Sequence, residues 1–282
     1  MSNDGSTKKP RVASELAARV ISSLALAGLA LVSAWYGGIV LAIVWSVAAI
    51  AVIWEWLKLI GISGGSLVAF WIFGAASILL SAFSDTLFGL DNYAMLWPAI
   101  IAALVLGVVA LLRKHSFVWT AAGPLYAAIV VLAPIWLRGR EPDGLVAVLW
   151  LFLVVWISDI GAYFVGRRIG GPKLWPAISP KKTWSGLFGG LFFGTLLASG
   201  FVLLDRMVVG PIFIGGIGLF ILTLGTSLVS ELGDLFESAM KRHFGAKDSG
   251  QIIPGHGGIM DRLDSFVAAG LFAVIVLDLF GF

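Results

Sequence analysis

Long apolar stretches separated by short polar segments dominate the chain, a pattern typical of helices that cross a membrane. A membrane-spanning helix needs about 20 mostly apolar residues, and the sequence offers nine such stretches. They cover residues 20–36, 38–57, 66–83, 93–112, 118–137, 145–166, 187–204, 211–232 and 266–282. We therefore predict an all-α, polytopic integral membrane protein with about nine transmembrane helices.

Composition supports this class. Of the 282 residues, 59% are hydrophobic and 12% are charged, whereas a soluble domain is about 45–50% apolar and about 25% charged. So few charges cannot cover the surface of a soluble enzyme. The formal net charge of +3 is too small to indicate a nucleic-acid partner, and the absence of cysteine excludes thiol catalysis.

The distribution of basic residues predicts the orientation. With the N-terminus in the cytoplasm, all but three of the 19 Lys and Arg residues fall in cytoplasmic segments, the exceptions being Arg138, Arg140 and Arg206. Positive charge collects on the cytoplasmic side of membrane proteins. Because the first five spans carry little polar content, we expect one membrane domain with two parts, a scaffold over residues 1–137 and a catalytic part over residues 138–282.

Two cytoplasmic segments, residues 158–186 and 231–264, are polar and rich in glycine. In the second, Glu231, Asp234, Ser238 and Lys241 fall along one face of a helix. Acids at membrane depth usually face a polar cavity or an ion, and this favours a functional role for Asp234. For Glu237 we favour a helix end whose carboxylate lies in water at the lipid headgroups.

The residues that follow combine acids, bases and glycines. Asp234 and Asp261 are suited to hold a hard divalent cation through their carboxylates, with Glu231 as a further candidate ligand. Gly257 and Gly258 offer bare N–H groups to phosphate oxygens. Positive charge for the same oxygens comes from Lys241, Arg242, Lys247 and Arg262. A basic loop alone would bind headgroups, but the added acids predict a metal–phosphate site.

The first segment has the same character with less specific signals. Asp159 and Tyr163 lie four residues apart on one helical face, and either function or a structural hydrogen bond would explain the acid. A rigid turn with two cations and two hydroxyls suits phosphate contact, although a lysine pair is also a common membrane anchor; it contains Ser179, Lys181, Lys182 and Thr183. His256 is suited to phosphate or proton transfer, and equally to a turn.

Together these motifs resemble a known family. The run from Ser238 through Lys241-Arg242, Lys247-Asp248 and Pro254-Gly-His256-Gly257-Gly258 to Asp261-Arg262-Leu-Asp264 is similar to the signature of phosphatidate cytidylyltransferases, also called CDP-diacylglycerol synthases. Asp159-x-Gly161-Ala162-Tyr163 and Ser179-Pro180-x-Lys182-Thr183 are similar to family motifs in the same order.

The resemblance implies that CTP and phosphatidic acid react to give CDP-diacylglycerol and pyrophosphate. It also implies Mg²⁺ dependence, allows a second cation such as K⁺, and implies a homodimer in the membrane lipid. We expect the bacterial cytoplasmic (inner) membrane, with the active site facing the cytoplasm. The implied catalytic residues are Asp234, Lys241, Arg242, Lys247, Asp248, His256, Asp261, Arg262 and Asp264. The implied substrate-binding residues are Asp159, Tyr163, Ser179, Lys181, Lys182, Thr183, Ser238, Gly257 and Gly258.

Three alternatives stay open at this point. An ion- or proton-coupled transporter would use Asp159, Glu231 and Asp234 as an ion path, but its polar residues should extend through both membrane halves. A lipid-binding scaffold would not need the paired acids. A different lipid kinase or nucleotidyltransferase would differ only in its nucleotide and product. Binding of CTP that depends on Mg²⁺ separates the predicted enzyme from the first two.

Overall fold

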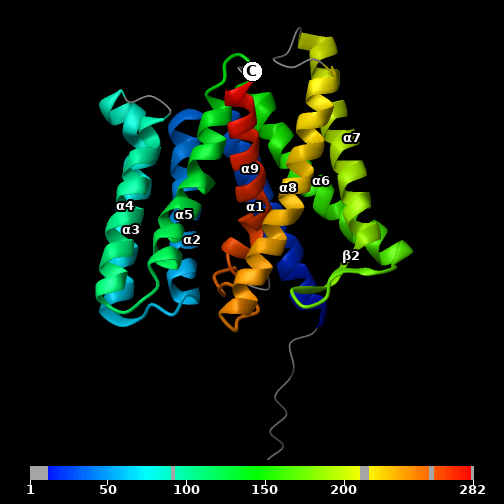
Figure 1. Ribbon diagram of the computed structural model, residues 1–282. Helices are drawn as coiled ribbons and strands as arrows, with labels where there is room; N and C mark the ends of the chain where they lie inside the picture. Colours follow the sequence, from blue (N-terminus) through cyan, green and yellow to red (C-terminus); the bar gives the residue numbers. More distant parts are fainter. Residues whose placement is uncertain (1–11, 90–92, 210–215, 254–256, 281–282) are drawn as a thin grey trace, which may run out of the picture.

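Nine α-helices, one 3₁₀ turn and one two-stranded hairpin form the part of the chain described by the computed structural model, residues 12–89, 93–209, 216–253 and 257–280 (Figure 1). The helices are α1 (Val12–Tyr36), α2 (Gly38–Leu59), α3 (Gly64–Phe88), α4 (Trp97–Leu112), α5 (Phe117–Arg138), α6 (Gly144–Ile169), α7 (Trp184–Val209), α8 (Gly216–His243) and α9 (Met260–Leu279). The turn η1 (Ala94–Leu96) precedes α4, and strands β1 (Lys173–Trp175) and β2 (Ser179–Thr183) lie between α6 and α7.

Within the described residues, each predicted span corresponds to one of these helices, which confirms an all-α polytopic membrane protein; residues 211–215 and 281–282 of the predicted spans lie outside the described residues. Seven of them, α2 to α8, are long and apolar enough to cross a membrane. In α1 the described apolar stretch, Val20–Tyr36, is shorter. In α9, charged residues lie near both ends and leave residues 265–277 as the apolar stretch between them. The count of nine crossings and the cytoplasmic N-terminus stay predictions.

One local prediction of secondary structure was wrong. The segment Ser179–Thr183 is not a turn but strand β2, which pairs antiparallel with β1 so that Lys173 faces Thr183 and Trp175 faces Ser179. The predicted helix with Glu231, Asp234, Ser238 and Lys241 along one face is confirmed, because α8 continues past the apolar stretch to His243. The acids of α8 therefore lie on one rigid helix that extends beyond its apolar part.

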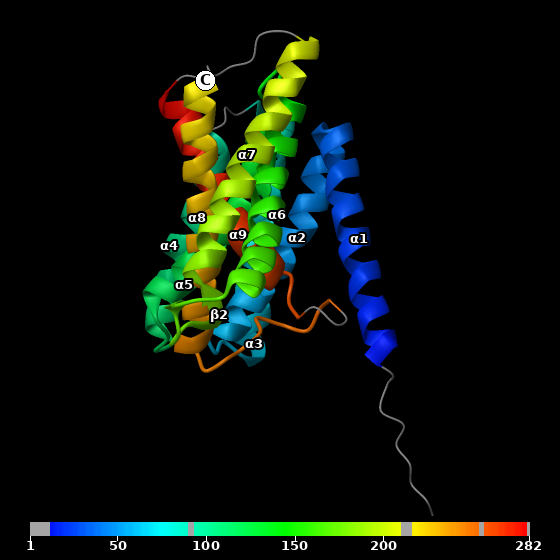
Figure 2. The same ribbon diagram turned by 90° about the vertical axis from the view of Figure 1, so that its right-hand side faces the viewer.

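Helix α9 lies in the middle of the bundle, where it contacts α2, α5, α6 and α8. Buried aromatic side chains fill the space around it: the ring of Trp45 in α2 stacks on Phe152 in α6 and on Phe266 in α9. Helices α3 and α4 form one edge of the bundle in Figure 1, and Figure 2 shows α1 at another edge. The contacts around α9 therefore fix the position of its N-terminal end, which carries Asp261, Arg262 and Asp264.

Helices α6 and α7 pack closely because glycines remove side chains from their contact. A Cβ on Gly189 would lie 2.4 Å from Cβ of Val165, and one on Gly194 would lie 2.1 Å from Oγ of Ser158. Small residues at such contacts let membrane helices approach each other. The β1–β2 hairpin joins this pair at the lower end of the bundle in Figure 1, where the α8–α9 connection also lies. Both polar segments of the sequence thus meet at one end.

Candidate active site

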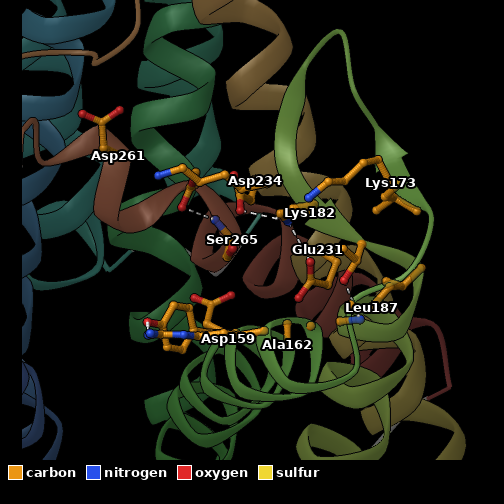
Figure 3. A pocket seen from close by; sticks show the side chains of 18 of the residues that line it. Asp159, Ala162, Lys173, Lys182, Leu187, Glu231, Asp234, Asp261 and Ser265 are labelled. Carbon is orange, nitrogen blue, oxygen red and sulfur yellow. Dashed lines mark hydrogen bonds and ion pairs between the residues drawn. The ribbon is translucent and has the colours of Figure 1, made fainter.

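A cavity of about 740 Å³ lies between the hairpin, α6, α8 and the first turn of α9 (Figure 3). Six acids line it: Asp159, Glu231, Asp234, Asp248, Asp261 and Asp264. Six bases line it as well: Arg167, Lys173, Lys181, Lys182, Lys241 and Arg262. Their formal charges cancel. Twelve of the predicted site residues, from both polar segments, therefore share one cavity: these acids, four of the bases, Tyr163 and Thr183.

Lys182 on β2 bridges two acids of α8. Its Nζ lies 2.7 Å from Oε2 of Glu231 and 2.9 Å from Oδ2 of Asp234, and Figure 3 shows the ammonium group between the two carboxylates. Burial alone would lower the pKa of Lys182, but the two carboxylates raise it overall. The lysine therefore stays charged and ties the hairpin to α8.

Lys241, one helical turn beyond Glu237, bridges a second pair of acids. Its Nζ forms an ion pair with Glu237 and another, at 2.6 Å, with Oδ1 of Asp261. Only 1% of Glu237 is exposed, so the predicted position in water at the headgroups was wrong. Because α8 packs against α9, this face of the helix is covered by protein.

Asp261 is held by the loop before α9 as well as by Lys241. Its Oδ2 accepts the N–H groups of Gly258 at 2.8 Å and Ser249 at 3.0 Å. Burial alone would raise the pKa of Asp261, but the bond from Lys241 and the N–H of Gly258 lower it overall. The group is therefore a carboxylate at neutral pH, as a metal ligand must be.

Asp159 and Tyr163 both line the cavity from α6. Asp159 is not buried among apolar side chains, because its carboxylate opens into the cavity (Figure 3). Tyr163 accepts a hydrogen bond of 2.8 Å from Nη1 of Arg167 through its hydroxyl group. The functional interpretation of Asp159 gains support from this placement, since no neighbouring helix takes the carboxylate as a structural partner within the described residues.

Six predicted residues do not line the cavity: Ser179, Ser238, Arg242, Lys247, Gly257 and Gly258. Three of them support residues nearby. Ser238 donates to Oδ1 of Asp234 at 3.2 Å, Arg242 donates to the carbonyl of Ala246 at 3.2 Å, and Gly258 gives its N–H to Asp261 rather than to open space. His256 lies outside the described residues.

The sequence did not single out several residues that the structure places here. Arg167 and Lys173 line the cavity, and they were counted only as positive charge on the cytoplasmic side. Glu55, on α2, contacts the loop before α9. A lone acid in an apolar span was the available signal for Glu55, because such residues are costly and usually have a partner.

The donor set of the cavity fits a hard cation. Its acids present carboxylate oxygens, the ligands that Mg²⁺ prefers, and Mg²⁺ typically takes one or two carboxylates and completes its shell with water and phosphate. Within the described residues, no three or more acids or histidines are grouped around one point, and Asp234 and Asp261 bond to different lysines. A site with one or two protein carboxylates is compatible with this arrangement.

These features define a polytopic membrane protein with a charged, phosphate-compatible site at one end of its helices. Comparison with known proteins is specific: the cytidylyltransferase family matches residues 17–280, and the chain belongs to this family. It is 41% identical to the phosphatidate cytidylyltransferase of Brucella suis over 95% of this chain and 94% of that protein. It is 37% identical to the phosphatidate cytidylyltransferase of Bacillus subtilis over 79% of this chain and 81% of that protein. The same comparisons give no support to the transporter alternative.

Proposed function

We propose that this protein transfers the cytidylyl group of CTP to phosphatidic acid, giving CDP-diacylglycerol and pyrophosphate. The observation that carries the proposal is the cavity, in which two segments far apart in the sequence bring six bases and six acids together in a chain of the cytidylyltransferase family. Relatives that align along most of this chain have the name phosphatidate cytidylyltransferase.

The reaction needs little proton chemistry. An anionic oxygen of phosphatidate attacks the α-phosphorus of CTP, a new P–O bond forms, and the bond to the oxygen that bridges to the β-phosphate breaks. Pyrophosphate leaves with that electron pair. Because the nucleophile is already charged, the barrier lies in bringing several phosphates together and in stabilising the leaving group.

The bases of the cavity are placed to lower this barrier. Lys181 and Lys173 on the hairpin have no ion-pair partner among the described residues and are exposed, so they can meet phosphate oxygens at little cost. Lys182 and Lys241 already bond to acids and would neutralise charge while keeping those acids in place. Asp248 and Asp264, which line the same cavity, would orient the bases.

We further propose Mg²⁺ as the cofactor, held by Asp234 and Asp261 with Glu231 as a further candidate ligand, and with room for a second cation such as K⁺. When bound, Mg²⁺ supplies positive charge to the phosphate oxygens. The nearby lysines would then rearrange only locally, because each reaches its acids through a flexible side chain.

The setting of the enzyme is part of the proposal. The basic residues at the end of the bundle that carries the cavity favour the cytoplasmic side, where CTP is available, and the bacterial relatives favour the inner membrane. The apolar tails of phosphatidate would stay in the lipid while its phosphate reaches the cavity. We also propose a homodimer, which cross-linking in native membranes would test.

An assay of the purified protein in lipid vesicles tests the activity. Labelled CTP, phosphatidic acid and Mg²⁺ should yield labelled CDP-diacylglycerol, and a chelator should stop the reaction until Mg²⁺ is restored. If the folded protein forms no CDP-diacylglycerol under these conditions, the proposal is wrong.

Single substitutions test the metal ligands. Asp234→Asn and Asp261→Asn each keep the size of the side chain and should lower turnover by about 100-fold or more, as loss of an essential electrostatic group does. Asp85→Asn, at an exposed aspartate of α3 that does not line the cavity, is the matched control and should leave turnover unchanged. Near-normal turnover of folded Asp234→Asn would exclude Asp234 as a ligand.

A further inference from the structure

Glu55 is an acid of α2 that is only 1% exposed, and it binds the loop that leads into α9. Its Oε1 accepts the N–H of Ile259 at 3.1 Å, and its Oε2 accepts the N–H of Met260 at 2.8 Å and the hydroxyl of Ser249 at 3.1 Å. The first N–H groups of a helix have no partner within the helix. Glu55 therefore satisfies donors at the start of α9 from a helix about 200 residues earlier.

Asp261 holds the same loop from the cavity side. Glu55 accepts the hydroxyl of Ser249 and Asp261 accepts its N–H, at 3.1 and 3.0 Å. At the other end of the loop, Asp261 accepts the N–H of Gly258 while Glu55 accepts the next two N–H groups. Two carboxylates thus hold both ends of the loop, that of Glu55 from α2 and that of Asp261 from the side of the cavity.

Two glycines of the loop leave room for the Glu55 carboxylate. A Cβ on Gly250 would lie 2.4 Å from Oε1 of Glu55, and one on Gly258 would lie 2.5 Å from Oε2 and 2.1 Å from Oγ of Ser249. A side chain at either position would force the loop, the Glu55 carboxylate or the Ser249 hydroxyl to move. The glycines are therefore needed at least in part for the approach of Glu55, besides any contact they make with substrate.

We propose that Glu55 is a positioning residue, which holds Ser249, Ile259 and the first turn of α9 so that Asp261 faces the cavity. The proposal rests on the proposed function for its kinetic consequence, but the geometry that it describes can be measured without any reaction. It gives the N-terminal half of the chain a direct part in the site.

Glu55→Gln is the primary variant, because it keeps the shape of the side chain but removes its charge and turns an amide N–H₂ toward backbone donors. We expect kcat/KM for CTP to fall by roughly 10–100-fold, the range found when supporting partners of metal-site residues are removed. Glu141→Gln makes the same chemical change at an exposed residue at the opposite end of the bundle and should leave kcat/KM unchanged.

The mobility of a spin label on the loop is a measurement that a loss of global stability alone would not change. The chain contains no cysteine, so Gln251→Cys, at an exposed loop position, can be labelled uniquely with a nitroxide. Well below the melting temperature, the label should become more mobile in Glu55→Gln and stay unchanged in Glu141→Gln. An unchanged spectrum together with unchanged kcat/KM would overturn the proposal, as would a loss of activity explained entirely by a smaller folded fraction.

Ser249→Ala keeps the test decisive if Glu55→Gln does not fold. It removes one of the three bonds to Glu55 and leaves the N–H of Ser249 free to bind Asp261. A kcat/KM about two- to fivefold lower with a more mobile label is expected, whereas no change in either would overturn the proposal. Ser46→Ala, at a buried serine of α2 whose hydroxyl has no partner among the described residues, is the control. Where both single variants fold, their effects should be less than additive in the double variant, because both act through one contact.

The two proposals fail in different ways. If the wild-type protein makes no CDP-diacylglycerol, the proposed function is wrong, yet the spin label still reports whether Glu55 holds the loop. If the wild-type protein is active and Glu55→Gln changes neither kcat/KM nor label mobility, only the positioning role is wrong.

Discussion

Replacement of Lys182 by methionine should destabilise the protein strongly, because it leaves two acids of α8 without their cation. Lys182 is one-fifth exposed and lies 2.7 Å from Glu231, of which only 3% is exposed. Asp234, at 2.9 Å, keeps 31% of its side chain exposed and can be solvated by water in the cavity. The consequence of the substitution is therefore dominated by Glu231.

The magnitude follows from this difference in burial. Removal of one partner of a buried ion pair costs about 3–5 kcal/mol, whereas an exposed pair contributes about 1 kcal/mol or less. We expect a total of about 3–5 kcal/mol for Lys182→Met. For a domain of comparable size, 1 kcal/mol shifts the melting temperature by about 2–4 °C, so the melting temperature should fall by roughly 6–20 °C.

Tryptophan fluorescence during heating measures the effect directly, since the chain contains 12 tryptophans. Lys181→Met, at the exposed neighbour on the same strand, is the matched control for stability and should melt within about 2 °C of the wild type. The double variant Lys182→Met/Glu231→Gln should recover at least half of the loss, because the buried charge is removed with its partner. If Lys182→Met has the same melting temperature as the control, or the double variant melts no higher than Lys182→Met, the ion pair does not hold Glu231 in place.

Three further predictions use the same measurements. Burial alone would lower the pKa of Lys182, but Glu231 and Asp234 raise it. The stabilisation by the charged lysine is therefore complete below the unfolded pKa of about 10.4 and is lost only as pH rises through the higher folded value. The difference in melting temperature between the wild type and Lys182→Met should stay constant from about pH 7 to about pH 10, and a difference that shrinks below pH 10 would contradict this. Arg140→Met breaks the ion pair with Asp278 at the opposite end of the bundle. It should lower the free energy of unfolding by about 1 kcal/mol and leave turnover unchanged. A fall in turnover at a temperature where the variant is folded would show that this ion pair affects the cavity. Gly258→Ala should lower turnover about tenfold or more, because the new Cβ would lie 2.1 Å from Oγ of Ser249. A Cβ on Gly200 meets no atom within 4 Å, so Gly200→Ala should behave as the wild type. Equal turnover of the two variants would show that the loop adapts.

The membrane class and the positions of the helices could be predicted because apolar length is a local property. Every apolar stretch of about 20 residues became a helix, since backbone groups in lipid must bond within their own segment. The continuation of α8 past its apolar stretch was predictable from the helical spacing of its polar residues. The hairpin was less predictable. Strand β2 was predicted as a turn, because its pairing with β1 depends on a second segment.

The site was predictable to the extent that its residues share a motif. Asp234, Lys241 and Asp261 were selected from spacing and depth, and the structure places them in one cavity. The partners of Asp234 and Asp261 were not predictable, because their ion pairs connect α8 to a hairpin and α8 to α9. Glu237 was assigned to water for the same reason: its burial is produced by a helix that follows in the chain.

The pairing of acids with lysines explains how a site rich in carboxylates can still bind phosphate groups. Lysines alone would attract any anionic headgroup of the membrane, and carboxylates alone would repel phosphate. In this cavity Lys182 and Lys241 each contact two carboxylates, so a phosphate has to displace a carboxylate or arrive with a cation of its own. Under the proposed function, a nucleotide with Mg²⁺ would bring both the phosphates and the cation, and the released carboxylates would be available to that cation. On that proposal, the charge balance favours a metal-bound triphosphate over a free lipid headgroup as the ligand that opens these ion pairs.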